Sequence, residues 1–216
     1  MASDNLKREA ECTAEELKLA QPLEPSEVQL EAWYMDDSEE DQREPHRKSP
    51  NEICSAETLK ELGVLVWKLD PSNLEDDPKL KAIRKVRGYT YHDVCCVAEG
   101  KLPEYEKKIK TFFEEPIHND EEIRYILDGN GYFDVRDKED RWVRISVGKG
   151  DMVVLPAGMY HRYTNTKDNY VQCMRLFAGE PVWTAHNRPQ EDNPARKEYV
   201  DQFLKPAVAS VSAFRG

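Results

Sequence analysis

Two segments of the sequence carry a histidine in a position suited to metal binding. In PIHNDEEIRYILDG, His118 stands four residues before Glu122, and in GDMVVLPAGMYHRYTN a Pro-Ala-Gly turn precedes His161. Side chains alternate along an extended strand, so a spacing of four places His118 and Glu122 on one face. Two neutral imidazoles and one carboxylate leave coordination positions open, as in non-haem Fe(II) oxygenases. We therefore predict that these three residues bind one metal ion.

Each of these residues also has an ordinary structural explanation. A single histidine in a strand more often packs in the core or faces solvent, and Glu122 belongs to an acidic run that solvent alone can stabilise. A histidine four residues before a glutamate is also a common chance occurrence. The metal-binding interpretation therefore depends on the combination of the two segments.

The residues after Phe113 fall into short apolar segments that favour β-strands. Turn-forming residues separate these segments at 129–131, 138–140 and 148–150. Short strands at this spacing indicate an all-β sandwich or barrel rather than βαβ units. Further strands are expected at 28–36 and 64–70, and helices at 14–20, 55–62, 78–87, 103–113 and within 192–205.

Composition and charge exclude several classes of partner. The formal charge is −11 over 216 residues, and no basic stripe matches the acidic clusters, which argues against a nucleic-acid partner. No apolar run approaches the ~18 residues of a membrane span, and the N-terminus lacks the apolar segment of a secretory signal. The five cysteines are scattered without a CxxC pair, which is typical of reduced thiols in a cytosolic protein.

The same composition suggests how the chain is divided. Residues 1–27 hold few large apolar side chains and are acidic, so we expect a mobile N-terminal extension. Residues 28–205 are expected to form the folded domain, and residues 206–216 a flexible C-terminal tail.

Both histidine segments resemble the two cupin motifs. The first runs from His118 through Glu122 to Gly129, and the second is carried by Gly150, Pro156, Gly158, His161 and Asn165. The likeness extends to acireductone dioxygenases over about residues 28–205, including WYMDDSEEDQR and the run that ends in EPVW, both outside the cupin motifs. This resemblance implies a mainly β fold, a single cupin barrel of the jelly-roll type with a few short flanking helices.

The resemblance also implies a reaction. Acireductone dioxygenases act in methionine salvage, joining O₂ to 1,2-dihydroxy-3-keto-5-methylthiopentene. With Fe(II) the products are formate and 2-keto-4-methylthiobutyrate, and with Ni(II) they are methylthiopropionate, formate and carbon monoxide. The implied partners are a small-molecule acireductone and O₂, with one Fe(II) or Ni(II) per chain. We expect a monomer that is located in the cytoplasm and, by similarity to the family, also in the nucleus.

Three residues near the predicted ligands match positions of the family's site. Arg124 shares a strand face with Glu122 and resembles the active-site arginine, a fixed positive charge beside an anionic substrate. Phe112 matches a pocket aromatic, and Tyr163 stands where many members have Phe. The alternatives are a surface ion pair for Arg124, a core helix residue for Phe112 and a packing aromatic for Tyr163.

One position departs from the family pattern. Members bind their metal through three histidines and one glutamate, and the first two histidines form His-x-His. Here Pro116 stands at the first position, and proline has no side-chain donor. We expect an active enzyme with weakened metal binding. The alternative is a catalytically impaired or inactive cupin that acts as a binding or regulatory protein; another metallocupin activity, such as isomerisation, fits the likeness outside the cupin motifs less well.

Overall fold

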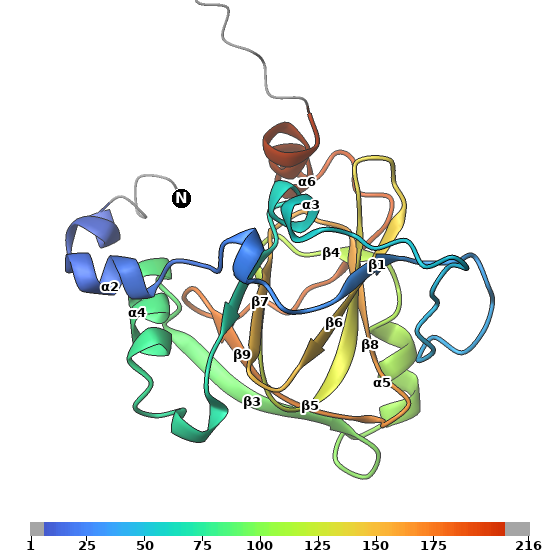
Figure 1. Ribbon diagram of the computed structural model, residues 1–216, viewed down its shortest axis with the longest axis horizontal. Helices are drawn as coiled ribbons and strands as arrows, with labels where there is room; N and C mark the ends of the chain where they lie inside the picture. Colours follow the sequence, from blue (N-terminus) through green and yellow to red (C-terminus); the bar gives the residue numbers. More distant parts are fainter. Residues whose placement is uncertain (1–6, 206–216) are drawn as a thin grey trace, which may run out of the picture.

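The long strand β5 (Glu122–Arg136) organises the sheet of the computed structural model, which describes residues 7–205. The first half of β5 pairs antiparallel with β7 (Asp151–Leu155) and β9 (Tyr170–Phe177). Its second half pairs antiparallel with β6 (Trp142–Gly148) and β8 (His161–Asn165). One strand therefore joins both sides of a curled sheet, which closes around an apolar interior (Figure 1).

Shorter elements complete this frame in the described part of the chain. The remaining strands are β1 (Ala32–Tyr34), β2 (Leu65–Lys68), β3 (Tyr91–Ala98), β4 (Pro116–Ile117) and β10 (His186–Asn187). The helices are α2 (Ala14–Leu19), α3 (Ala56–Glu61), α4 (Pro78–Arg87), α5 (Tyr105–Thr111) and α6 (Pro194–Tyr199), with single turns η1 (Pro25–Glu27), η2 (Pro71–Asn73) and η3 (Val200–Leu204). The expected mainly β fold with short flanking helices is confirmed. Among the described helices, none is long and apolar enough to cross a membrane.

Strand β7 shows how the core is divided into two layers. Its side chains alternate: Val153 and Leu155 pack inside the barrel, while Met152 and Val154 pack on the outside. The outer layer is covered by α4 and the end of α2, which lie side by side in Figure 1. Because both faces of β7 are buried, its sequence is a continuous apolar run rather than an alternating one.

The turn expected at residues 129–131 is wrong, because these residues lie inside β5. The glycines serve a different purpose there. Gly129 has a φ of +74°, and a Cβ at this position would lie 2.4 Å from the carbonyl oxygen of Tyr170. A Cβ at Gly131 would lie 2.2 Å from the hydroxyl of Tyr163. The glycines therefore let neighbouring strands approach β5 while it bends.

The described part of the N-terminal segment, residues 7–27, makes contacts with the domain, and the mobility of the extension stays a prediction. Helix α2 begins at the predicted capping box of Thr13 and Glu16. Lys85 of α4 donates to the Glu16 carboxylate, and the Trp67 indole donates to the carbonyl oxygen of buried Ala20 at 3.1 Å. Sequence composition could not reveal these contacts, because they use main-chain and charged groups. The tail at 206–216 lies outside the described residues.

Strand β3 was not predicted, because its sequence YHDVCCVA mixes exposed polar and partly buried apolar residues. It lies at the edge of the sheet and pairs antiparallel with β9 along its whole length. The expected strand at 28–36 is shorter, reduced to β1, and the helix expected from Pro103 begins at Tyr105.

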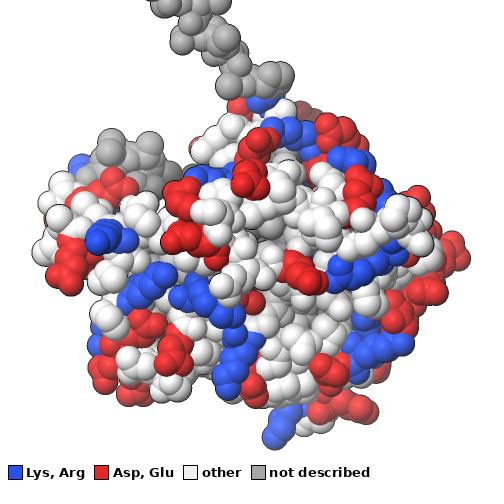
Figure 2. All heavy atoms as spheres, in the orientation of Figure 1, with Lys and Arg blue, Asp and Glu red and all other residues white. Residues whose placement is uncertain are grey.

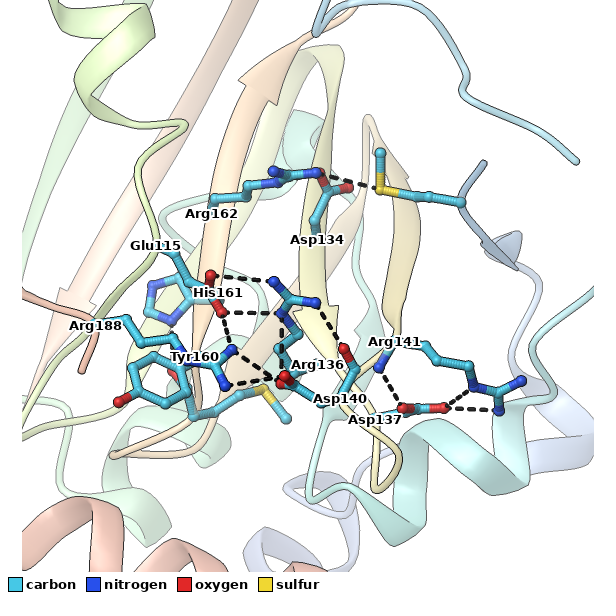
Figure 3. A network of polar contacts seen from close by, with 12 residues as sticks. Glu115, Asp134, Arg136, Asp137, Asp140, Arg141, Tyr160, His161, Arg162 and Arg188 are labelled. Atoms are coloured by element: carbon cyan, nitrogen blue, oxygen red, sulfur yellow. Dashed lines mark hydrogen bonds and ion pairs between the residues drawn. The ribbon is translucent and has the colours of Figure 1, made fainter. Parts of the chain in front are cut away.

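A buried ion cluster fixes the second half of β5. Asp134 and Arg144 are both fully buried, and the Asp134 carboxylate accepts hydrogen bonds from Arg144 Nε at 2.7 Å and Nη2 at 2.8 Å. The same carboxylate accepts from Arg162 Nε of β8 at 2.8 Å, as Figure 3 shows. Arg144 also donates to the carbonyl oxygens of Gln42 and Glu44. One carboxylate thus ties β6, β8 and the loop before Pro45 to β5.

We predict that Asp134→Ala lowers the free energy of unfolding by about 3–5 kcal/mol, because it leaves the buried Arg144 charge without its partner. The matched control is Asp76→Ala, which breaks an exposed ion pair with Lys81 and should cost less than about 1 kcal/mol. Urea unfolding followed by tryptophan fluorescence measures both values. Equal losses in the two variants would show that the cluster does not carry this stability.

Candidate metal centre

His118, Glu122 and His161 converge, with one potential ligand atom from each lying within 4.8 Å of the others. His118 follows β4, Glu122 begins β5 and His161 begins β8. The expectation that one regular strand carries both His118 and Glu122 is wrong, since residues 118–121 lie between β4 and β5. The three groups meet because β5 bends, which brings Glu122 and the β8 pairing partner Val135 to the same end of the barrel.

Main-chain contacts bring the two histidine segments together. The amide of Gly158 donates to the carbonyl oxygen of His118 at 2.9 Å. Gly158 has a φ of +77°, and a Cβ there would lie 2.2 Å from the carbonyl oxygen of Ala195 at the start of α6. Glycine is therefore required both by the backbone conformation and by the close approach of α6.

A second set of contacts anchors the segment that leads into β4. The Glu115 carboxylate accepts from Arg136 Nε at 2.9 Å and from Arg188 Nη1 at 2.8 Å (Figure 3). Arg136 ends β5, and Arg188 follows β10, which pairs with β4. These contacts fix Pro116 and Ile117 relative to the C-terminal end of β5.

Hydrogen bonds orient both imidazoles in the same way. His118 Nδ1 lies 2.9 Å from the carbonyl oxygen of Thr184, and His161 Nδ1 lies 2.9 Å from the carbonyl oxygen of Met159. A carbonyl oxygen only accepts, so each Nδ1 carries the proton and each Nε2 keeps a free lone pair. This is the tautomer that a metal-binding imidazole needs.

The charges at the site favour an ionised Glu122 carboxylate beside a neutral His161 imidazole. Burial raises the pKa of Glu122, but the positive charge of Arg124 is the largest opposing influence, and the net pKa is lowered. Burial lowers the pKa of His161 to about 4, against the opposing pull of Glu122. Arg124 Nη2 lies 2.6 Å from a Glu122 oxygen. At neutral pH Glu122 and His161 are thus in the protonation states that bind metal.

These side chains open into a cavity of about 290 Å³ that is mostly apolar. Phe112 lines it at the rim, where it is 36% exposed, so it is not a core helix residue. Pro116 is buried and lines the same cavity. Arg124 lines it beside Glu122, which excludes an ordinary surface ion pair.

The Tyr163 ring lines the cavity, but its hydroxyl is already engaged. It donates to Oδ1 of buried Asn165 at 2.9 Å, and the ring packs against Phe133 with centroids 5.0 Å apart. Asn165 in turn donates to the carbonyl oxygen of Val97 at 2.9 Å. The Tyr163 hydroxyl therefore supports the wall between β8 and β3.

Arg175 and Trp183 are among the cavity residues that the sequence analysis missed. Arg175 of β9 is the register partner of Arg124 on β5 and binds Asp93 through two hydrogen bonds. Trp183 lines the cavity and is 43% exposed. The centroid of its ring lies 4.1 Å from the guanidinium carbon of Arg175. The signal for Arg175 was a single charge inside the apolar run YVQCMRLF, and EPVW marked Trp183 only as part of a family resemblance.

The surface outside the cavity carries no single-sign expanse on the face that Figure 2 shows. Acidic and basic side chains are interspersed there, with uncharged atoms between them. Glu122, Arg124 and Arg175 are among the charged residues that line the cavity.

Comparison with known proteins adds independent evidence. Residues 31–185 match the family model described as the ARD/ARD' family. An acireductone dioxygenase 3 from Physcomitrium patens is 61% identical over 184 residues, which cover 85% of this chain and 91% of that protein. An acireductone dioxygenase 3 from Arabidopsis thaliana is 61% identical over 176 residues, which cover 82% of this chain and 88% of that protein.

A solved structure shows the same fold. It is an acireductone dioxygenase from Bacillus anthracis with a cadmium ion in its active centre. The match covers 73% of this chain and 98% of that one, with a TM-score of 0.56 and 22% sequence identity. The family model and the relatives at about three-fifths identity together decide the classification: this chain belongs to the ARD/ARD' family, the acireductone dioxygenases.

Proposed function

We propose that this protein is a metal-dependent acireductone dioxygenase of methionine salvage. Its substrates are 1,2-dihydroxy-3-keto-5-methylthiopentene and O₂, and its products with Fe(II) are formate and 2-keto-4-methylthiobutyrate. With Ni(II) the products are methylthiopropionate, formate and carbon monoxide. The observation that carries the proposal is the convergence of His118, Glu122 and His161 in a largely apolar cavity that Arg124 and Arg175 also line.

The residues present fit a divalent metal ion. Two Nε2 lone pairs and one ionised carboxylate point at a common position, and this nitrogen and oxygen donor set suits iron or nickel. His118, Glu122 and His161 would hold the ion. When bound, it supplies a Lewis acid with open positions, which stabilises negative charge on a chelated enediolate.

The surrounding residues bind and orient the substrate. Arg124 and Arg175 face each other across β5 and β9 and present positive charge to an anionic enediolate. Phe112, Phe133 and Trp183 form apolar wall on which an alkylthio chain can pack.

Pro116 makes this site differ from the four-ligand pattern. Its ring lines the cavity, so the position of the first histidine offers an apolar surface instead of a donor. We propose that the protein binds its metal through three side chains, more weakly than relatives with His-x-His. Three ligands still suffice for a facial set, so turnover is retained.

A second function is favoured by the same proline. If three ligands cannot position a chelating substrate, the protein is a non-catalytic member that binds small anions in the cavity and acts as a regulatory protein. Misplacement of a substrate by about 1 Å can lower the rate about 100-fold. A small shift of the bound substrate would therefore be enough to make the protein non-catalytic. We place the protein in the cytoplasm and nucleus as a monomer, by analogy with the family.

Oxygen uptake with the acireductone under saturating Fe(II) tests the proposed reaction. We expect the wild type to turn over. Loss of a residue that only supports a metal ligand typically lowers activity by about 10–100-fold. Glu122→Ala should lower turnover by more than this, because Glu122 is the only carboxylate among the three candidate ligands. The control Glu139→Ala removes an exposed carboxylate and should keep the wild-type rate. Equal rates for wild type and Glu122→Ala would favour the non-catalytic function.

Replacing the proline by the missing ligand tests the role of position 116. Pro116→His should tighten Ni(II) binding at least about tenfold, equivalent to about 1.4 kcal/mol, because it adds an imidazole to the set. It should also raise turnover. Pro116→Ala removes the ring without adding a donor and should leave affinity unchanged. Titration calorimetry measures the Ni(II) affinity of both variants. Equal affinity for wild type and Pro116→His would mean that another group already serves as fourth ligand.

A further inference from the structure

Two cysteines face each other in the wall of the cavity. Cys95 of β3 and Cys173 of β9 are direct register partners in an antiparallel pair. Both line the cavity, so both side chains leave the sheet on the same face. Both are free thiols, and neither has a role in the proposed reaction.

The register permits a covalent bond between them. Directly opposed residues of an antiparallel pair have Cα atoms about 4.5 Å or about 5.5 Å apart, depending on the hydrogen-bonding position. Disulfides span Cα separations of about 4.4–6.8 Å, which includes both cases. No other cysteine shares this arrangement among the described residues: the register partner of the neighbouring Cys96 is Gln172.

The surroundings make the pair reachable by a small oxidant. Cys173 is 7% exposed and Cys95 is more accessible, and both line the cavity. Burial raises the pKa of the Cys173 thiol to about 12, although the guanidinium groups of Arg124 and Arg175 act in the opposite direction. Cys173 therefore stays protonated, and the more accessible Cys95 is the thiol that a small oxidant attacks first.

We infer that Cys95 and Cys173 form an oxidisable thiol pair, a modification site for hydrogen peroxide in the wall of the substrate cavity. The Cys95 thiolate attacks peroxide, the O–O bond breaks, and a sulfenic acid and water result. Cys173 sulfur then attacks the Cys95 sulfur, forming the S–S bond and releasing a second water. In total, two thiols lose two hydrogens and two electrons to one peroxide, which is reduced to two waters.

The cross-link changes the cavity and leaves the three candidate metal-binding residues as they are. It joins β3, an edge strand, covalently to β9, the strand that carries Arg175. It also replaces two separate thiols by one bridging group beside Arg124 and Val97. The inference stands apart from the proposed reaction, because its readout is thiol chemistry.

The test treats the full-length protein with excess hydrogen peroxide, without and with later reduction by dithiothreitol. We expect the number of titratable thiols under denaturing conditions to fall from five to three. Peptide mass spectrometry should show the Cys95 and Cys173 peptides joined, lighter by two hydrogen atoms than the separate thiols, and dithiothreitol should separate them.

Three variants make the result specific. Cys95→Ser and Cys173→Ser should each abolish the joined peptide, while Cys96→Ser, the neighbouring thiol on the other side of β3, should leave it intact. Circular dichroism verifies that each variant is folded. The inference is overturned if wild type yields only sulfinic acid at Cys95, if Cys96 is the joined residue, or if all five thiols survive.

Discussion

Everything at the candidate site depends on the double pairing of β5. Its first half hydrogen-bonds to β7 and β9, and its second half to β6 and β8, so a single strand holds two sides of the barrel. A register shift between Ile126 and Asp128 and the two close-packed glycines allow the bend between the halves. Without this bend, Glu122 and the partner of His161 would lie at opposite ends of an extended strand.

The two ends of β5 are stabilised by different interactions. Near its second end, the buried Asp134 carboxylate and the guanidinium groups of Arg144 and Arg162 fix strand β8 close to His161. A buried charge is tolerable only when it is paired and hydrogen-bonded, and here each partner meets that condition. At its first end, the Glu122 carboxylate forms an ion pair with Arg124. The positive charge of Arg124 keeps Glu122 ionised.

The sequence predicts the fold class and the residues of the site better than it predicts the contacts that position them. Turn residues at 138–140 and 148–150 and the capping box at Thr13 depend on local chemistry, and the structure has both turns and the helix. The pairing of Cys95 with Cys173 and of Arg124 with Arg175 depends on strand register, which no local pattern contains. The carbonyl oxygens of Thr184 and Met159 that orient the imidazoles belong to the main chain, so residue type could not identify them.

The bond from His118 Nδ1 to the carbonyl oxygen of Thr184 has a thermodynamic consequence. The three candidate ligands come from three separate segments, and a fourth segment orients one of them. An unfolded chain holds none of these groups together, so a metal ion bound here interacts with the native state alone. At a free metal concentration of 100 times Kd, this linkage adds about 2.7 kcal/mol to the free energy of unfolding. Metal binding would therefore stabilise the folded chain as well as supply chemistry, and the free energy of unfolding would depend on the metal concentration.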